Sequence, residues 1–243
     1  MLTVRLKKLG LKPGDLVLDL GCGEGRHVHG VYMEGGVNVV GLDIDLPSLK
    51  NAREGLDYLD DLNGKPETKS LTAFVRGSAY QLPFADNTFD AIICSEVLEH
   101  LDAYPDVIDE IRRVLKPQGM LAATIPHAWP ERICWKLAPP PNGYPFEPGG
   151  HIRIFDDIHL KYEFVHHGFS FLHKHHAHGL HAPYWWLKCA FWSRRDDHPL
   201  VKAYHSLLVW DLMKRPWLTR FLEALTAPVM GKSVAMYFKA TDK

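Results

Sequence analysis

Residues 17–25 read VLDLGCGEG, an apolar strand pattern that runs directly into three glycines placed at every second position. Glycine has no Cβ atom, so such a loop lets the backbone approach a ligand closely where a strand turns into a helix. The G-x-G-x-G spacing differs from the G-x-G-x-x-G of dinucleotide-binding folds. The stretch therefore predicts a strand, a ligand-binding turn and a helix, which together begin an α/β fold.

Apolar runs alternate with amphipathic stretches through the first half of the chain. Five of these runs predict strands, at residues 16–20, 37–43, 71–76, 90–95 and 120–125. Strands that alternate with helices are typical of a parallel sheet. Two later runs, 169–178 and 233–239, predict two further strands. We therefore expect one α/β domain over residues 1–243 with a Rossmann-like, mostly parallel sheet of seven strands.

The alternation breaks down after Pro126. Residues 127–150 contain six prolines and a Gly-Gly pair, which predict an irregular segment. Residues 180–228 predict two or three helices that are rich in aromatic side chains. We expect these two segments to be cap insertions on a core formed by residues 1–126, with residues 232–240 as the final strand.

The charges nearly cancel over the whole chain but are separated along it. The 28 Lys and Arg against 29 Asp and Glu give a net charge of −1, which argues against a general nucleic-acid-binding protein. Residues 1–150 carry 15 basic and 21 acidic side chains, a net of −6, whereas residues 151–243 carry 13 and 8, a net of +5. The second part also holds 11 of the 15 histidines and 5 of the 7 tryptophans, so we expect the two parts to have different roles.

Other classes of protein are excluded by what the sequence lacks. No run reaches the roughly 18 apolar residues of a membrane span, and the first residues contain no apolar run suited to a signal peptide. The cysteines at positions 22, 94, 134 and 189 form no C-x-x-C pair, which argues against a disulfide scaffold and a structural zinc site. We therefore expect a cytoplasmic protein.

Two carboxylates lie at the ends of neighbouring predicted strands. Asp19 precedes the first glycine by two residues. A carboxylate at this position favours a ligand with an ammonium group over a ligand with a pyrophosphate. A phosphate group binds best at the positive end of a helix when no acidic side chain lies beside it. Asp43 ends the second strand, where a carboxylate can accept hydrogen bonds from both hydroxyls of a ribose. An ammonium group at one strand end and a ribose at the next describe S-adenosylmethionine.

The sequence resembles the class I S-adenosylmethionine-dependent methyltransferases, and within them the small-molecule group of ubiquinone, sterol and sugar methyltransferases. Besides the glycine loop and GLDID at 41–45, the resemblance rests on three motifs: GSA…LPF…FD within 77–90, CSEVLEHL at 94–101 and LKPQG at 115–119. It covers residues 13–126 closely and 151–171 more loosely. It implies the strand order 3-2-1-4-5-7-6 with strand 7 antiparallel, S-adenosylmethionine as cofactor and S-adenosylhomocysteine as product.

The resemblance also implies roles for individual residues. The methionine part of the cofactor would be held by Asp19, Gly21, Cys22, Gly23 and Gly25. The ribose would bind Asp43, the adenine would lie against Ile44 and beside Ser78 and Ala79, and Ser95 and Glu96 would border the acceptor cavity. The family usually has Asp-Ala where this chain has Ser78-Ala79, so we expect weaker adenine recognition.

Methyl transfer by in-line displacement needs alignment of the acceptor with the methyl group and the exclusion of water. An oxygen acceptor usually also needs a base that removes its proton, and the imidazole of histidine is suited to this role. Three histidines fall where the resemblance places the acceptor cavity: His100, His127 and His151. Each has a structural alternative. His100 would order a loop, His127 would only line the cavity, and His151 would hold a lid through Arg153.

A second group of histidines lies in residues 173–181, HKHHAHGLH. His173 and His175 would share one face of a strand, so a chelating pair is geometrically feasible. Lys174 lies between them, however, and no cysteine or close carboxylate completes a ligand set. We expect no metal site in this protein.

The aromatic insertion allows three interpretations. It can be a helical cap over the acceptor site, an apolar groove or peripheral membrane surface around residues 183–195, or a homodimer interface. The membrane interpretation rests on tryptophans next to basic side chains, a combination suited to lipid headgroups.

The sequence therefore predicts a methyltransferase for a small, partly apolar acceptor, with oxygen as the favoured acceptor atom. One alternative is a tRNA wobble-uridine methyltransferase, which shares the motifs and would need a basic face. Another is a cofactor-binding subunit that supports a catalytic partner without transferring methyl groups itself.

Overall fold

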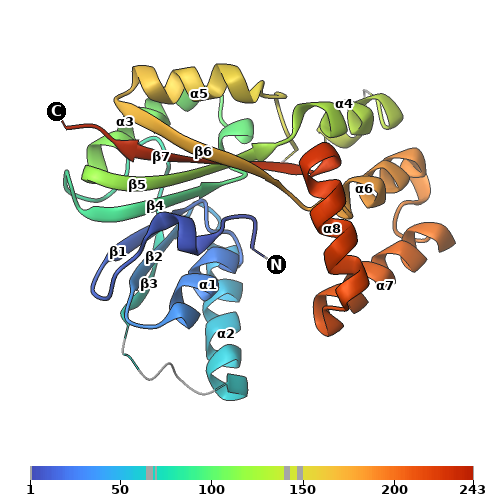
Figure 1. Ribbon diagram of the computed structural model, residues 1–243, viewed down its shortest axis with the longest axis horizontal. Helices are drawn as coiled ribbons and strands as arrows, with labels where there is room; N and C mark the ends of the chain where they lie inside the picture. The colour runs from blue at the N-terminus through green and yellow to red at the C-terminus, as the bar shows by residue number, and fades with distance from the viewer. Residues whose placement is uncertain (1, 64–67, 69, 140–142, 147–149, 243) are drawn as a thin grey trace.

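The computed structural model describes residues 2–63, 68, 70–139, 143–146 and 150–242. Its centre is a seven-stranded sheet in the order β3-β2-β1-β4-β5-β7-β6, which confirms the expected order (Figure 1). Strands β1 to β5 pair in parallel, and β7 is antiparallel to both β5 and β6. The strands are β1 Leu16–Leu20, β2 Asn38–Asp43, β3 Thr72–Arg76, β4 Phe89–Ser95, β5 Leu115–Pro126, β6 Phe169–Ala177 and β7 Ser233–Ala240.

Helices cover both faces of the sheet because the strands are apolar on both sides. Leu18 and Leu20 of β1 belong to one buried cluster with residues of α3 and α5, whereas Val17 belongs to another with residues of α1. Alternation along the strand produces this division, since successive side chains point to opposite faces. The flanking helices are α1 Arg26–Glu34, α2 Leu46–Asn63, α3 Tyr104–Val114 and α5 Asp157–His166, with the short turns η1 Leu6–Leu9 and η2 Leu98–His100.

Four further helices gather at the end of the sheet where the parallel strands have their carboxyl ends (Figure 1). They are α4 Ala128–Leu137, α6 His181–Ala190, α7 Pro199–Lys214 and α8 Trp217–Met230, with the short turns η3 Tyr144–Phe146 and η4 Trp192–Arg194. The three helices α6 to α8 confirm the helical prediction for this insertion. How residues 1–243 divide into core and cap stays a prediction.

The prediction that residues 127–150 are irregular is wrong for their first part, which forms α4. Pro130 falls in the first turn of this helix, where a backbone N–H has no partner within the helix, so proline costs little there. Pro139 comes after the helix has ended. Residues 140–142 and 147–149 lie outside the described residues, so the prediction is untested there.

Strand β5 begins earlier than the sequence predicts. The sequence predicts this strand from residue 120, but the LKPQG segment at 115–119 is already part of β5, and Leu115 pairs with Phe89. The pairing shifts register before Ala91, and Gln118 has a left-handed φ of 63°. A proline and a left-handed residue are tolerated here because the strand is irregular at this end.

The orientation of α6 depends on one carboxylate of α8. Both oxygens of Glu223 accept backbone N–H groups at the start of α6, from Gly179 at 2.9 Å and from Leu180 at 3.0 Å. The Tyr204 hydroxyl of α7 donates to the Leu180 carbonyl at 3.0 Å. These bonds join α6 to both α7 and α8.

We predict that Glu223→Ala destabilises the helical end of the molecule. Two backbone N–H groups lose their acceptors, at a cost of about 1–3 kcal/mol. Amide hydrogen exchange should accelerate in α6 while the protection of β1 and β4 stays unchanged. Glu34→Ala, at an exposed position of α1, is the control and should change stability by less than about 0.5 kcal/mol. Unchanged exchange in α6 would show that Glu223 does not hold this helix.

Candidate functional site

The glycine loop leaves β1 with an unusual backbone. Gly21, Gly23 and Gly25 have φ values of 67°, 50° and 80°, in the region that favours glycine. A Cβ atom on Gly21 would lie 2.4 Å from Cγ2 of Val97, so the loop passes directly over the end of β4. A Cβ atom on Gly23 would meet nothing within 4 Å. The loop is therefore closed on its β4 side and open at Gly23, as a ligand cradle requires.

Asp19 brings an unpaired carboxylate oxygen to this loop. The side chain is buried, and its Oδ2 atom has no hydrogen-bond partner among the described residues. Burial raises the pKa of Asp19 to about 7. His27 has its Nδ1 atom 4.0 Å from Oδ1, but burial lowers the pKa of His27 to about 3, so this imidazole is neutral and does not balance the charge. A ligand ammonium group would satisfy the carboxylate.

The end of β2 presents a fixed carboxylate and an exposed apolar side chain. Asp43 accepts the Gly23 N–H at 2.8 Å and the Asp45 N–H at 2.9 Å, one on each oxygen. Each carboxylate oxygen keeps a second lone pair, which is available to a ribose hydroxyl. Ile44 is 67% exposed, which is unusual for a side chain of this type and leaves a flat apolar surface.

The Ser78-Ala79 segment lies beside this strand end. The N–H of Gly77 donates to the Asp43 carbonyl at 3.0 Å, which holds the segment next to β2. The Ser78 hydroxyl accepts the Tyr80 N–H at 3.3 Å. One of its acceptor positions is thus used locally, and weaker adenine recognition at Ser78 stays a prediction.

Side chains at the end of β4 form a short hydrogen-bond chain. Ser95 and Thr124 have their hydroxyl oxygens 2.9 Å apart, and the Thr124 hydroxyl donates to Glu96 at 3.1 Å. Glu96 has a φ of 57°, a left-handed conformation that is uncommon outside glycine. Cys22 is buried, and its thiol donates to the Gly23 carbonyl at 3.7 Å, so only its backbone can face a ligand.

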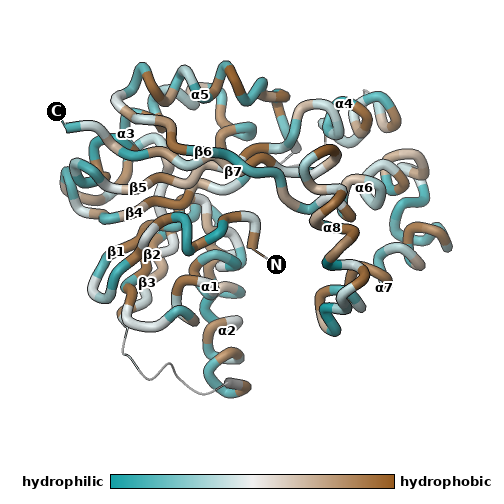
Figure 2. Tube along the Cα trace, in the orientation of Figure 1, coloured by the Kyte–Doolittle hydropathy of each residue, from teal (hydrophilic) through white to brown (hydrophobic). Residues whose placement is uncertain are grey.

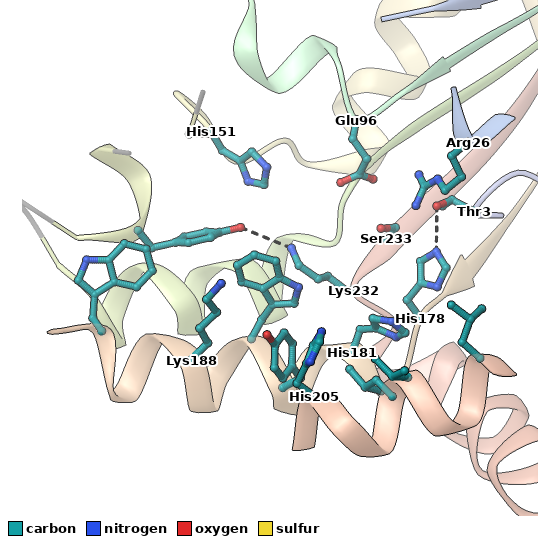
Figure 3. A pocket seen from close by; sticks show the side chains of 18 residues that line it. Thr3, Arg26, Glu96, His151, His178, His181, Lys188, His205, Lys232 and Ser233 are labelled. Carbon is teal, nitrogen blue, oxygen red and sulfur yellow. Dashed lines mark hydrogen bonds between the residues drawn. The ribbon is translucent and has the colours of Figure 1, made fainter. Parts of the chain in front are cut away.

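A cavity of about 660 Å³ opens between the sheet and the helices α6 and α7 (Figure 3). Arg26 and Glu96 line the side toward the glycine loop, and Trp185 and Trp192 line the side toward α6 and η4. The lining also includes the titratable side chains His151, His178, His181, Lys188, His205 and Lys232. The cavity thus extends from Arg26, the first residue after the glycine loop, to a partly aromatic wall, a combination suited to a small, partly apolar molecule.

The three candidate bases lie in different places. His151 lines the cavity, and its Nδ1 atom is 2.6 Å from Glu131. His100 lies behind it, with the ring centroids 5.1 Å apart and Nδ1 bonded to the Gly150 carbonyl at 3.1 Å. His127 is not among the residues that line the cavity; its Nδ1 atom bonds the Gly231 carbonyl at 3.0 Å.

Sequence reasoning missed Lys232, Glu131 and Tyr144. Glu131 is buried on α4 and lies 3.4 Å from the Lys232 ammonium, which in turn lies 3.5 Å from the Tyr144 hydroxyl. Burial lowers the pKa of Lys232, but the carboxylates of Glu131 and Glu96 outweigh it and raise that pKa above its usual value. The GKS turn before the last predicted strand was the one available signal, and it carries no chemistry by itself.

The comparisons with known proteins agree with this geometry. A family model described as "Methyltransferase domain" matches residues 18–123. This stretch is a class I S-adenosylmethionine-dependent methyltransferase domain. Its cofactor is S-adenosylmethionine, and the unpaired Asp19 oxygen, the open glycine loop and the fixed Asp43 carboxylate suit the ammonium group, the backbone and the ribose of that molecule.

Related sequences match less than half of the chain. The sterol 24-C-methyltransferase ERG6B of Gibberella zeae is 38% identical over 112 residues, which is 46% of this chain and 28% of that protein. An uncharacterized methyltransferase of Schizosaccharomyces pombe is 38% identical over 111 residues, 45% of this chain and 39% of that protein. The match thus spans less than a third of the sterol methyltransferase.

Solved structures share the fold over nearly the whole chain. A methyltransferase of Methanosarcina mazei has a TM-score of 0.63 at 15% identity and covers 100% of both chains. The cyclase SpnF has a TM-score of 0.62 at 19% identity and covers 98% of this chain and 79% of that chain. At these identities the likeness shows the fold alone, and the name of the second protein shows that the fold also serves another reaction.

We predict that Asp19→Asn weakens S-adenosylmethionine binding by about 10–100-fold at pH 7.5, since a charge-assisted bond to the ammonium group becomes a neutral one. Because the pKa of Asp19 is raised to about 7 in the free protein, binding to the wild type must expel a proton at lower pH. Its Kd should therefore rise as the pH falls from 7 to 5, by up to about tenfold per unit. Isothermal titration calorimetry measures both effects.

The asparagine variant should lose this dependence on pH, and Asp57→Asn, at an exposed position of α2, should bind like the wild type. Asp19→Asn should fold normally, because the amide has nearly the same shape and removes a buried carboxylate whose Oδ2 atom has no hydrogen-bond partner among the described residues. Equal affinity of wild type and Asp19→Asn at pH 7.5 would show that Asp19 does not bind the ammonium group.

Proposed function

We propose that the protein transfers the methyl group of S-adenosylmethionine to a small, partly apolar acceptor that binds in the cavity. The observation that carries this proposal is the continuity of the cavity, which runs from Glu96 and Arg26 at the glycine loop to the aromatic side chains of α6 (Figure 3). The sterol methyltransferases that match the chain support an apolar acceptor, although their similarity covers under half of this chain.

The bound cofactor would supply a methyl group on a positively charged sulfur. Asp19 would hold its ammonium group and Asp43 its ribose, so the sulfonium would lie toward Glu96. The carboxylates of Asp19 and Glu96 would offset the positive charges of the cofactor, and the helices over the cavity would exclude water. The role of these residues is mainly to align the acceptor atom for in-line displacement.

We favour an oxygen acceptor, with His151 as the best placed of the three candidate bases. Its Nδ1 atom faces the Glu131 carboxylate, an acceptor, so Nδ1 carries the proton and Nε2 has a free lone pair. Glu131 would also stabilise the imidazolium that forms when Nε2 takes the proton of an acceptor hydroxyl. The sterol relatives are named for transfer to carbon, so carbon is the second acceptor atom to test.

A second part of the proposal is peripheral contact with an anionic membrane. No helix in the described part of the chain is long and apolar enough to cross a membrane. Hydrophobic residues are frequent along α8 instead (Figure 2). Those exposed on its surface recur every four residues, at Trp217, Phe221, Leu225 and Val229, and are between 59% and 77% exposed. Basic side chains at Lys214, Arg215 and Arg220 accompany them, a pattern suited to a lipid surface.

The sequence places the membrane-contacting tryptophans at residues 183–195, whereas the structure turns them toward the protein. Trp185, Trp186 and Trp192 pack against a small buried cluster around Cys134 and Cys189. The Trp186 indole N–H also donates to the Pro130 carbonyl at 3.0 Å, which joins α6 to α4. The exposed stripe of α8 is therefore the better candidate for lipid contact.

Methyl transfer is tested by incubating the protein with methyl-labelled S-adenosylmethionine and a panel of hydroxylated aromatic, terpenoid and sterol compounds. We expect label in an organic-soluble product, with one S-adenosylhomocysteine formed per methyl group. Label in tRNA would favour the wobble-uridine alternative. Calorimetric binding of the cofactor without label in any pool would favour a non-catalytic subunit.

We predict that His151→Ala lowers kcat by about 10²–10⁴-fold with little change in cofactor affinity. His127→Ala should keep near-normal turnover, because His127 does not line the cavity. Near-normal turnover of His100→Ala, His127→Ala and His151→Ala alike would refute a histidine base.

Membrane contact is tested by flotation with vesicles that contain an anionic phospholipid. We predict that the wild type floats, that high salt weakens the association and that the double substitution Trp217→Ser with Phe221→Ser abolishes it. The control is Tyr58→Ser, at an exposed position of α2. A wild type that stays unbound and elutes as a dimer lost in the double variant would instead make α8 a homodimer interface.

A further inference from the structure

Glu99 is a buried acidic side chain for which the packing of the fold provides no hydrogen-bond partner among the described residues. The side chain is fully buried at the end of β4, and neither carboxylate oxygen has a hydrogen-bond partner among the described residues. A buried carboxyl group without partners is costly, so its presence indicates a ligand that would satisfy it.

Two imidazoles face the same point. One donor atom from each of Glu99, His100 and His151 lies within 4.8 Å of the other two. The Nδ1 atoms of both histidines are occupied, by the Gly150 carbonyl and by the Glu131 carboxylate. Both partners are acceptors, so each Nδ1 carries the proton and each Nε2 presents a lone pair.

This pattern is the one that metal-binding histidines show in proteins, where the second ring nitrogen donates to a carboxylate or a carbonyl. We propose that Glu99, His100 and His151 bind one divalent transition-metal ion at the inner wall of the cavity. The proposal differs from the expectation of a metal-free protein, because nothing in the local sequence connects position 151 with positions 99 and 100.

The donor set selects the class of ion. Two imidazoles and one carboxylate suit Zn²⁺, Fe²⁺ or Co²⁺ better than Mg²⁺ or Ca²⁺, which prefer oxygen ligands alone. Bonds of about 2.1 Å require donor atoms ~3.0–3.5 Å apart, so atoms that now lie within 4.8 Å of one another need to close by at most about 1.3–1.8 Å.

The backbone holds the three ligands together although they come from distant positions. The Ile152 N–H donates to the Glu99 carbonyl at 3.0 Å, and His100 bonds Gly150 through its side chain. The segment that carries His151 is thus joined to η2, which carries the other two ligands. Three protein ligands leave at least one coordination position unfilled, and His151 connects the site with the cavity because it is part of the cavity lining.

An ion in this place would also deepen the proposed function, and this part of the inference rests on that function. It would bind an acceptor through oxygen and lower the pKa of an acceptor hydroxyl, so that the proton leaves more readily. His151 Nε2 would then serve as a ligand rather than as a base. The acceptor class implied is a molecule with a hydroxyl or a pair of neighbouring oxygens.

The test uses purified protein that has been treated with a chelator and carries no affinity tag. Titration with Co²⁺ should give visible d–d absorption that saturates at one ion per chain, and calorimetry should show Zn²⁺ competing for the site. Glu99→Gln, His100→Gln and His151→Gln should each weaken binding by at least ~100-fold, and Glu131→Gln by ~10–100-fold because it acts through His151. Zn²⁺ should raise the Tm of the wild type but not that of Glu99→Gln.

Matched controls separate this site from the half-buried histidines of β6. His175→Gln and His176→Gln should bind Co²⁺ like the wild type, and Glu99→Gln should be at least as stable as the wild type without metal, because it removes a buried acid. Absence of saturable binding, or binding that persists in Glu99→Gln and falls in His175→Gln, would overturn the proposal. Metal binding needs neither cofactor nor acceptor, so a protein that binds Co²⁺ at this site but methylates no acceptor would refute the proposed function alone.

Discussion

The reversal of strand order between β1 and β4 is the constraint on which the site depends. The sheet grows from β1 toward β3 in one direction and from β4 toward β6 in the other, and the helices after β1 and β4 cover opposite faces. A crevice therefore opens at the carboxyl ends of these two strands. The glycine loop crosses it so closely that a Cβ atom on Gly21 would overlap Val97. Asp19, Asp43 and Glu96 meet there because their strands end at one edge.

The parts of the fold and of the site that could be predicted from the sequence are those determined by short stretches of consecutive residues. The glycine loop, Asp43 and the end of β4 are each set by a local strand-to-loop transition, and the parallel order then brings them together. The α4 helix was not predicted, because the number of prolines in residues 127–150 says nothing about their positions relative to a helix. Pro130 lies in the first turn, where a helix tolerates proline.

The residues that sequence could not predict depend on contacts between distant segments. Pairing of Pro126 with Ser233 places the turn before β7 beside the end of β5, and the His127 N–H donates to the Lys232 carbonyl at 2.7 Å. Only this antiparallel register brings the Lys232 ammonium to Glu131. Likewise, nothing in the local sequence indicates that His151 returns to Glu99 and His100, because 50 residues separate them and the link is a backbone bond from Ile152.

The acidic first part and the basic second part of the chain are joined by an ion pair at Lys232. This buried ammonium from the basic second part of the chain lies 3.4 Å from Glu131 and 5.0 Å from the ring of Trp185 on α6. It thereby joins the core to the helices over the cavity. Glu131 in turn bonds His151, so the same carboxylate that fixes the lysine also sets the protonation of the imidazole in the cavity. Whether Nε2 of that imidazole takes a proton or binds a metal ion, its lone pair is available because Glu131 holds the proton on the opposite nitrogen.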